Sequence, residues 1–163
     1  MSTLIAPCPL ADHHDLDQFS CGVPTLDNWL KKRARPNERS RASRTYVLCI
    51  DKRVIGYYAL ASGSLAAKYA LGKIKRNMPD PIPVMVLGRL AIDKEYQGKK
   101  LGDALLRDAI LRILQAAEIA GIKAILVHAI SEEAKKFYLD RSFIISPAEP
   151  MTLILPLKSI LGK

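Results

Sequence analysis

The chain has 163 residues, of which 49% are hydrophobic and 25% are charged. This balance excludes a disordered or fibrous protein, and the length predicts one domain over residues 1–163. A formal net charge of +9 points to a polyanionic partner. The first residues lack a basic segment ahead of an apolar stretch, and no run reaches about 18 apolar residues, so we expect no membrane segment and a cytoplasmic location.

The first predicted helix begins at Pro24, and apolar residues recur at helical spacing until Pro36, which should end it. A strongly basic stretch overlaps its end. Between Lys31 and Arg44 seven residues are Lys or Arg and one is acidic, which gives this stretch a charge of +6. Clustered cations gain binding energy when they release counterions from phosphates. The stretch therefore fits a polyanion footprint, although a solvated surface is an equal alternative.

The next segments predict a β-hairpin and a buried strand. Residues 44–50 and 54–61 read as antiparallel strands joined by a polar turn. Residues 65–81 combine a short helical pattern with Gly and Pro and are left open between helix and loop. Residues 83–92 form a nearly continuous apolar run, which is typical of a strand buried on both faces. We expect this strand at the centre of the sheet.

The second half predicts a parallel strand-helix-strand unit. An amphipathic helix is expected over residues 98–120, ended by Gly121, and a buried strand over residues 122–129. Strand, helix and strand imply a parallel crossover. A short helix then begins near Ser131, an expected N-cap, and two short strands close the chain. The fold class is therefore α/β, with an α+β component.

The junction between the central strand and the long helix has chemistry of its own. Residues 96–102 read YQGKKLG, a glycine-containing turn that feeds a helix start. Unpaired backbone N–H groups and the positive end of the helix dipole suit a pyrophosphate there. Lys99 and Lys100 add positive charge. A tight loop with ordinary solvated lysines explains the same residues equally well.

The order of strand, glycine loop, amphipathic helix, strand and short helix with Tyr138 resembles the acetyl-CoA-binding half of the GNAT acetyltransferases over residues 43–156. The family pattern Q/R-x-x-G-x-G/A maps onto residues 97–102 and departs at Lys100, where the family has glycine. This resemblance implies a mixed, mostly antiparallel central sheet with a parallel acetyl-CoA-binding core, flanked by helices. It also implies an N-acetyltransferase with acetyl-CoA as co-substrate.

Four further blocks narrow the resemblance to the GNAT toxins of bacterial toxin-antitoxin pairs, the TacT-like group. The blocks are residues 19–30 (FSCGVPTLDNWL), 44–47 (RTYV), 56–60 (GYYAL) and 86–93 (VLGRLAID). The resemblance implies acetylation of the α-amino group of aminoacyl-tRNA, which stalls translation. It further implies a ribbon-helix-helix antitoxin, through which DNA would be contacted, and a homodimer.

Carried over to this chain, the resemblance makes Tyr138 the general acid that protonates the departing thiolate. A tyrosine is protonated at neutral pH and can serve in this way. The alternative is a core or surface aromatic, with Phe137 as the better core candidate. The cofactor contacts would be Leu90, Ala91, Ile92, Gln97, Gly98, Lys99, Lys100, Leu101, Gly102 and Ser131. The tRNA contacts would be Lys31, Lys32, Arg35, Arg39, Arg41, Arg76 and Arg89.

Other chemistry has less support. Cys8, Cys21 and Cys49 lack the paired spacing of zinc or redox motifs, so we expect free thiols, no metal and no covalent acetyl-enzyme. His13, His14 and His128 are expected to be structural, and no general base is indicated.

Two rival functions remain. One is a GNAT enzyme acting on a small amine or a protein amino group. The other is a non-catalytic module that binds RNA or an antitoxin.

Overall fold

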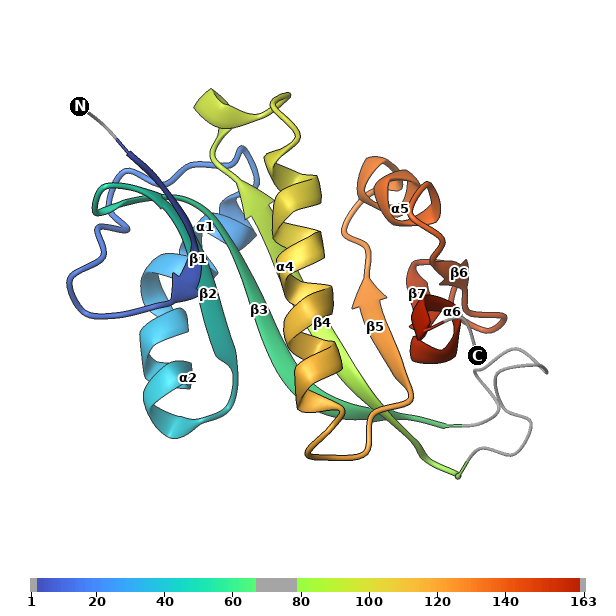
Figure 1. Ribbon diagram of the computed structural model, residues 1–163. Helices are drawn as coiled ribbons and strands as arrows, with labels where there is room; N and C mark the ends of the chain where they lie inside the picture. The colour runs from blue at the N-terminus through green and yellow to red at the C-terminus, as the bar shows by residue number, and fades with distance from the viewer. Residues whose placement is uncertain (1–2, 67–78, 162–163) are drawn as a thin grey trace. The chain divides into compact units, whose positions relative to one another are not determined.

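The computed structural model describes residues 3–66 and 79–161 (Figure 1). The segment left open between helix and loop lies largely outside these residues. The described chain forms two compact units, each built from two stretches: Met1–Ala61 with Gly88–Leu111, and Ser62–Leu87 with Arg112–Lys163. None of the described helices is long and apolar enough to span a membrane. The expectation of one domain over residues 1–163 stays a prediction.

In the first unit the strand order is β1-β2-β3-β4. The elements are β1 (Leu4–Pro9), β2 (Arg44–Ile50), β3 (Arg53–Leu65) and β4 (Ile82–Ile92). Strands β2 and β3 form the predicted antiparallel hairpin, whose turn places Asp51 at φ 53°. Strand β1 was not predicted, because Pro7 and Pro9 argue against a strand. It is an edge strand, where proline is tolerated.

The first helical region differs from the prediction at Pro36. Helix α1 (Pro24–Lys32) ends before this proline, and a second helix, α2 (Ala34–Ser40), contains it. Pro36 stands in the first turn of α2, where its missing N–H is not needed for an intrahelical bond. The proline therefore does not end helical structure here. The break lies at Arg33 instead, between the two helices.

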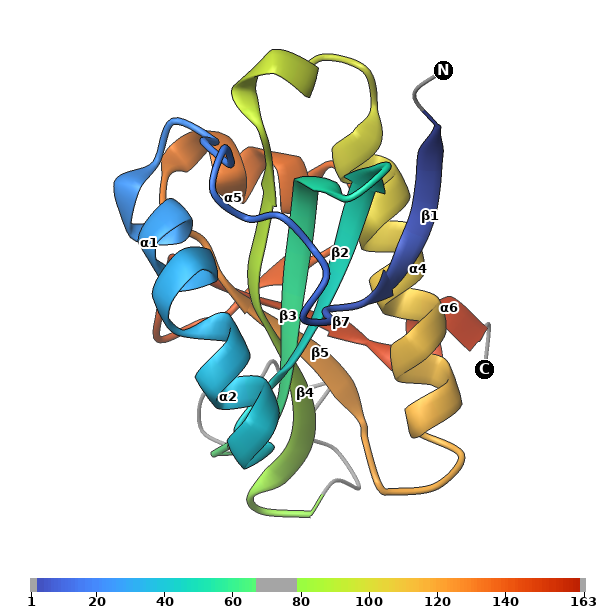
Figure 2. The ribbon, with the colours of Figure 1, turned by 90° about the vertical axis from the view of Figure 1, so that its left-hand side faces the viewer.

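Helices cover both sides of the sheet in the first unit. Figure 2 shows α1 and α2 on one side of β2 and β3 and the start of α4 (Leu101–Ala116) on the other. Gly56 lets α4 approach β3, because a Cβ there would lie 2.8 Å from Ile92 Cδ1 and 3.2 Å from Leu105 Cδ1. The helix is shorter than the predicted 98–120 at both ends. Residues 98–100, the first three of the predicted helix, precede α4 and form a glycine-containing loop instead.

In the second unit the strand order is β4-β5-β7-β6. Its further elements are β5 (Ala124–His128), α5 (Glu132–Leu139), β6 (Ile144–Ile145), β7 (Thr152–Pro156) and α6 (Leu157–Leu161), of which only α6 was not expected. Strand β5 pairs parallel to β4 and antiparallel to β7. The mixed, mostly antiparallel sheet with one parallel strand-helix-strand core is thus confirmed. The predicted N-cap is confirmed too, since Ser131 Oγ accepts a hydrogen bond from Ala134 N.

Candidate active site

The glycine loop of the first unit connects the short 3₁₀ helix η2 (Lys94–Tyr96) to the start of α4 at Leu101. Gly98 has φ 81°, and a Cβ there would meet nothing within 4 Å. The N–H groups of Leu101 and Gly102 lie in the first turn and have no intrahelical acceptor. The loop is therefore open and donor-rich at a helix N-terminus, which fits a pyrophosphate.

Lys100 explains why the family uses glycine at this position. Its φ is 63°, in the left-handed region that costs an L-residue roughly 1–2 kcal/mol. The chain accepts this strain and keeps the turn that feeds α4. Lys99 lies beside it with Nζ 5.4 Å from the centre of the Tyr96 ring. In the family pattern the glycine lets the pyrophosphate come close to the backbone. In this chain two ammonium groups stand at the same loop.

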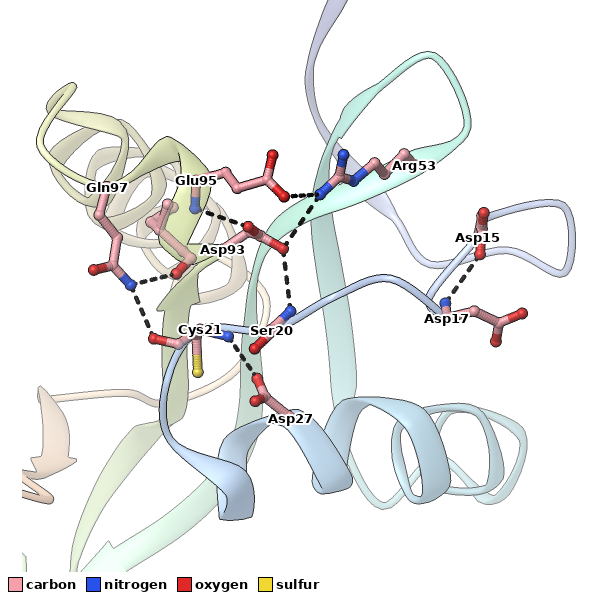
Figure 3. Close-up of polar contacts among 10 residues, drawn as sticks. Asp15, Asp17, Ser20, Cys21, Asp27, Arg53, Asp93, Glu95 and Gln97 are labelled. Atoms are coloured by element: carbon pink, nitrogen blue, oxygen red, sulfur yellow. Dashed lines mark hydrogen bonds and ion pairs between the residues drawn. The ribbon is translucent and has the colours of Figure 1, made fainter.

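The side chain of Gln97 has a structural role that the motif alone does not reveal. Its Nε2 donates to Cys21 O at 2.9 Å and to Ile92 O at 2.8 Å (Figure 3). These two bonds tie the segment before α1 to the end of β4. Any contact of Gln97 with a pyrophosphate therefore falls to its backbone, since both amide hydrogens have acceptors.

Like Gln97, Asp93 links separate segments of the first unit, so we call these two residues braces. The sequence interpretation gave Asp93 no role. Its carboxylate is 2% exposed and accepts hydrogen bonds from Ser20 N at 3.1 Å and Glu95 N at 2.9 Å (Figure 3). Arg53 Nη2 lies 3.6 Å from the same carboxylate. The acidic end of the 86–93 block, directly after a buried strand, is the signal that could have identified it. Asp93 and Gln97 together fix the approach to the glycine loop.

The end of β4 is placed for a second ligand contact. The parallel register joins Val84–Leu87 of β4 to Ala124–Val127 of β5, and β4 then runs on for five residues to Ile92. Leu90, Ala91 and Ile92, which the resemblance makes cofactor contacts, lie in this extension. Backbone polar groups beyond the parallel register can pair with an extended ligand.

Tyr138, and not Phe137, is the core residue of α5. Tyr138 is 7% exposed and packs edge-on against Phe143, with ring centres 5.2 Å apart. Phe137 is half-buried, with the Arg141 guanidinium 3.7 Å above its ring. The prediction that Phe137 is the better core residue was wrong, because the helix turns Tyr138 inward. Burial raises the pKa of the Tyr138 phenol well above its usual value, so the group holds its proton at neutral pH.

The proposed tRNA contacts differ in their surroundings. Arg35 is engaged within the fold, since Nη2 donates to the carbonyl oxygens of Ala11, Asp12 and His14. Arg89 stacks over Trp29, with its guanidinium carbon 4.4 Å from the ring centre. Arg76 lies outside the described residues. The remaining four are exposed in the first unit: Lys31, Lys32, Arg39 and Arg41.

The cysteines and histidines differ in burial. Burial raises the pKa of the Cys21 thiol to about 11, which suits a packed thiol and not a nucleophile. His14 is buried, Ala11 N donates to its Nδ1 at 2.9 Å, and desolvation lowers its pKa. His128, expected within an apolar strand, is instead exposed at the end of β5. Within the described residues no group of three His, Cys, Asp or Glu could hold a metal ion.

The mixed sheet and the glycine loop at the start of α4 define an acetyl-CoA-dependent acetyltransferase. The chain belongs to the GNAT acetyltransferases, whose family model, described as an acetyltransferase (GNAT) domain, matches residues 41–145. A tRNA-acetylating toxin of Mycobacterium tuberculosis (strain ATCC 25618 / H37Rv) is 51% identical over 158 residues, which cover 97% of this chain and 95% of the relative.

Two solved structures extend the comparison. AtaT complexed with acetyl-methionyl-tRNAfMet superposes with a TM-score of 0.91 at 30% identity, covering 98% of both chains. A tyrosine-to-phenylalanine mutant of AtaT, bound to the C-terminus of the antitoxin AtaR and to acetyl-CoA, has a TM-score of 0.82 at 30% identity and covers 96% of this chain and 95% of that one.

Proposed function

We propose that the protein is a toxin that transfers the acetyl group of acetyl-CoA to the α-amino group of aminoacyl-tRNA and thereby blocks translation. The observation that carries this proposal is the 51% identity to a tRNA-acetylating toxin over 97% of the chain. The fold adds support, because AtaT with acetyl-methionyl-tRNAfMet matches it from end to end.

Acetyl-CoA would be held by residues of the first unit. Backbone N–H groups of residues 97–102 would bind the pyrophosphate, helped by the ammonium groups of Lys99 and Lys100. The backbone of Leu90, Ala91 and Ile92 would hold the pantetheine arm. In the second unit Tyr138 would protonate the departing thiolate, and Ser131 would contribute at the start of α5. The thioester supplies the activated acetyl group.

The proposed partners follow from the relatives. AtaT binds the C-terminus of its antitoxin AtaR, and we propose an antitoxin of the ribbon-helix-helix type for this protein, with DNA contacted through it. We also propose a homodimer and a cytoplasmic location, where charged tRNA is found.

The product tests the chemistry directly. Purified protein is incubated with charged tRNA and labelled acetyl-CoA, the ester is hydrolysed, and the released amino acid is identified by mass. We expect the label on the α-nitrogen of that amino acid. Label found only on protein lysines or on free small amines would replace this function with that of another GNAT enzyme.

The salt dependence of tRNA binding tests the basic footprint. Replacing Arg39 and Arg41 with Ala should lower the log-log salt slope by roughly 0.7–0.9 for each phosphate that the protein no longer neutralises, because both side chains are exposed. Arg35→Ala is the matched control. It should lower thermal stability and leave the slope of the folded protein unchanged, because its guanidinium is bound to three backbone carbonyls. A wild-type slope in the double mutant would make this stretch a solvated surface.

A further inference from the structure

His128 stands out among the residues of β5. The four residues before it, Ala124–Val127, are buried, whereas His128 is exposed. It is the first residue of β5 after the register that pairs β5 with β4. The carboxyl end of a parallel strand is where open α/β sheets bind their ligands. The strand thus delivers an imidazole to the edge at which chemistry is expected.

The ring of His128 is held in place by a buried neighbour. Its Nδ1 lies 2.9 Å from Thr152 Oγ1, and the two residues are register partners in β5 and β7. Thr152 is 8% exposed, and its own backbone is fixed on both sides by bonds from Thr152 N to Glu149 O and from Ser146 N to Thr152 O. When Nδ1–H donates to Oγ1, Nε2 carries the lone pair. A histidine oriented through one nitrogen can accept a proton at the other.

The proposed general acid belongs to the same unit and follows closely in the chain. Helix α5, which carries Tyr138, begins at Glu132, four residues after His128. Figure 1 shows α5 beginning just beyond the tip of the β5 arrow. An imidazole and a protonated phenol thus come from consecutive elements of the second unit, with His128 at the end of β5 and Tyr138 in the last turn of α5. Acyl transfer from a thioester to an ammonium is accelerated by a base for the ammonium and an acid for the thiolate.

We propose that Nε2 of His128 is the general base that deprotonates the α-ammonium group of the substrate; this assignment rests on the function proposed above. The nitrogen begins with three protons and ends as an amide with one. The first proton goes to Nε2, the nitrogen lone pair then forms the C–N bond, and the C–S bond breaks. Tyr138 protonates the thiolate and is reprotonated from solvent, to which the second nitrogen proton and the proton on Nε2 are released.

Chemical rescue provides the test. His128→Ala should lower kcat for aminoacyl-tRNA by about 10²–10⁴-fold, with acetyl-CoA affinity and melting temperature close to wild type. Added imidazole should restore part of the rate, and a series of small amine bases should restore more as base strength rises. Tyr138→Phe, measured in parallel, should not respond to these bases. His13→Ala replaces another exposed histidine and should retain the wild-type rate.

Thr152→Val tests whether the orientation of the His128 ring matters, because the imidazole itself stays in place. It removes the partner of Nδ1 and keeps the shape of the side chain, so kcat should fall while KM for acetyl-CoA changes little. Wild-type kcat in His128→Ala, or a loss that no added base restores, would overturn the assignment. If the wild-type protein itself fails to acetylate aminoacyl-tRNA, the proposed function has failed, and that result is read before any variant is compared.

Discussion

Tyr138→Phe is expected to lower kcat by about 10²–10⁴-fold while leaving the affinity for acetyl-CoA nearly unchanged. The substitution keeps the ring, which packs against Phe137 and Phe143 with ring centres 5.2 Å away in each case. Only the hydroxyl is lost. Because burial raises the pKa of this phenol, the lost group is one that stays protonated at neutral pH and can donate.

This result requires kcat and the acetyl-CoA dissociation constant to be measured separately. Phe143→Leu is the matched control, since it disturbs the packing around the ring and keeps the hydroxyl. It should lower the melting temperature and retain most of the turnover. An unchanged kcat in Tyr138→Phe would remove the residue from the mechanism. In cells the same variant should no longer arrest growth, and excess peptidyl-tRNA hydrolase should relieve the arrest caused by the wild-type protein.

Asp93→Ala is expected to lower the free energy of unfolding by about 3 kcal/mol. The change leaves the N–H groups of Ser20 and Glu95 without their acceptor, and it removes the buried carboxylate that faces Arg53. Acetyl-CoA affinity should fall as well, because the freed segment leads directly into η2 and the glycine loop. Urea denaturation and calorimetric titration measure the two effects.

Glu95→Gln provides the control for this variant. The Glu95 side chain is 67% exposed, and its carboxylate lies 3.4 Å from Arg53 Nη2. Exposed ion pairs of this kind contribute at most about 1 kcal/mol. A similar loss of stability in Asp93→Ala and Glu95→Gln would show that the buried Asp93 carboxylate contributes no more to the free energy of unfolding than an exposed one.

Much of the fold could be predicted because its strongest patterns are local. The apolar run at 83–92 and the polar turn at 51–53 each specify an element without help from distant residues. Pro36 misled the prediction, since a proline ends one helix or begins the next depending on where its missing N–H falls. Strand β1 was not predicted for a related reason. Its two prolines are tolerated only because it pairs on one side, which is a property of the sheet and not of the segment.

A candidate site could be named from its motif, whereas the residues that support it could not. The glycine loop, the end of β4 and Tyr138 could be named from the resemblance. The partners of Gln97 could not, because Cys21 O lies 76 residues away in the sequence. Arg35 shows the same limit from the other side. In the sequence it cannot be told from the other cations of the basic stretch, and only its bonds to the carbonyls of Ala11, Asp12 and His14 reveal its structural role.

The braces at Asp93 and Gln97 also set the order in which the chain can fold. They join residues 73 and 76 positions apart. The chain loses conformational entropy when it closes such a loop, before the contacts can stabilise it. As the chain leaves the ribosome, the bonds of Ser20 and Cys21 to Asp93 and Gln97 cannot form until these two later residues have emerged. Contacts of such long range slow folding. Completion of the contacts that Ser20 and Cys21 make with Asp93 and Gln97 is therefore a late step in folding.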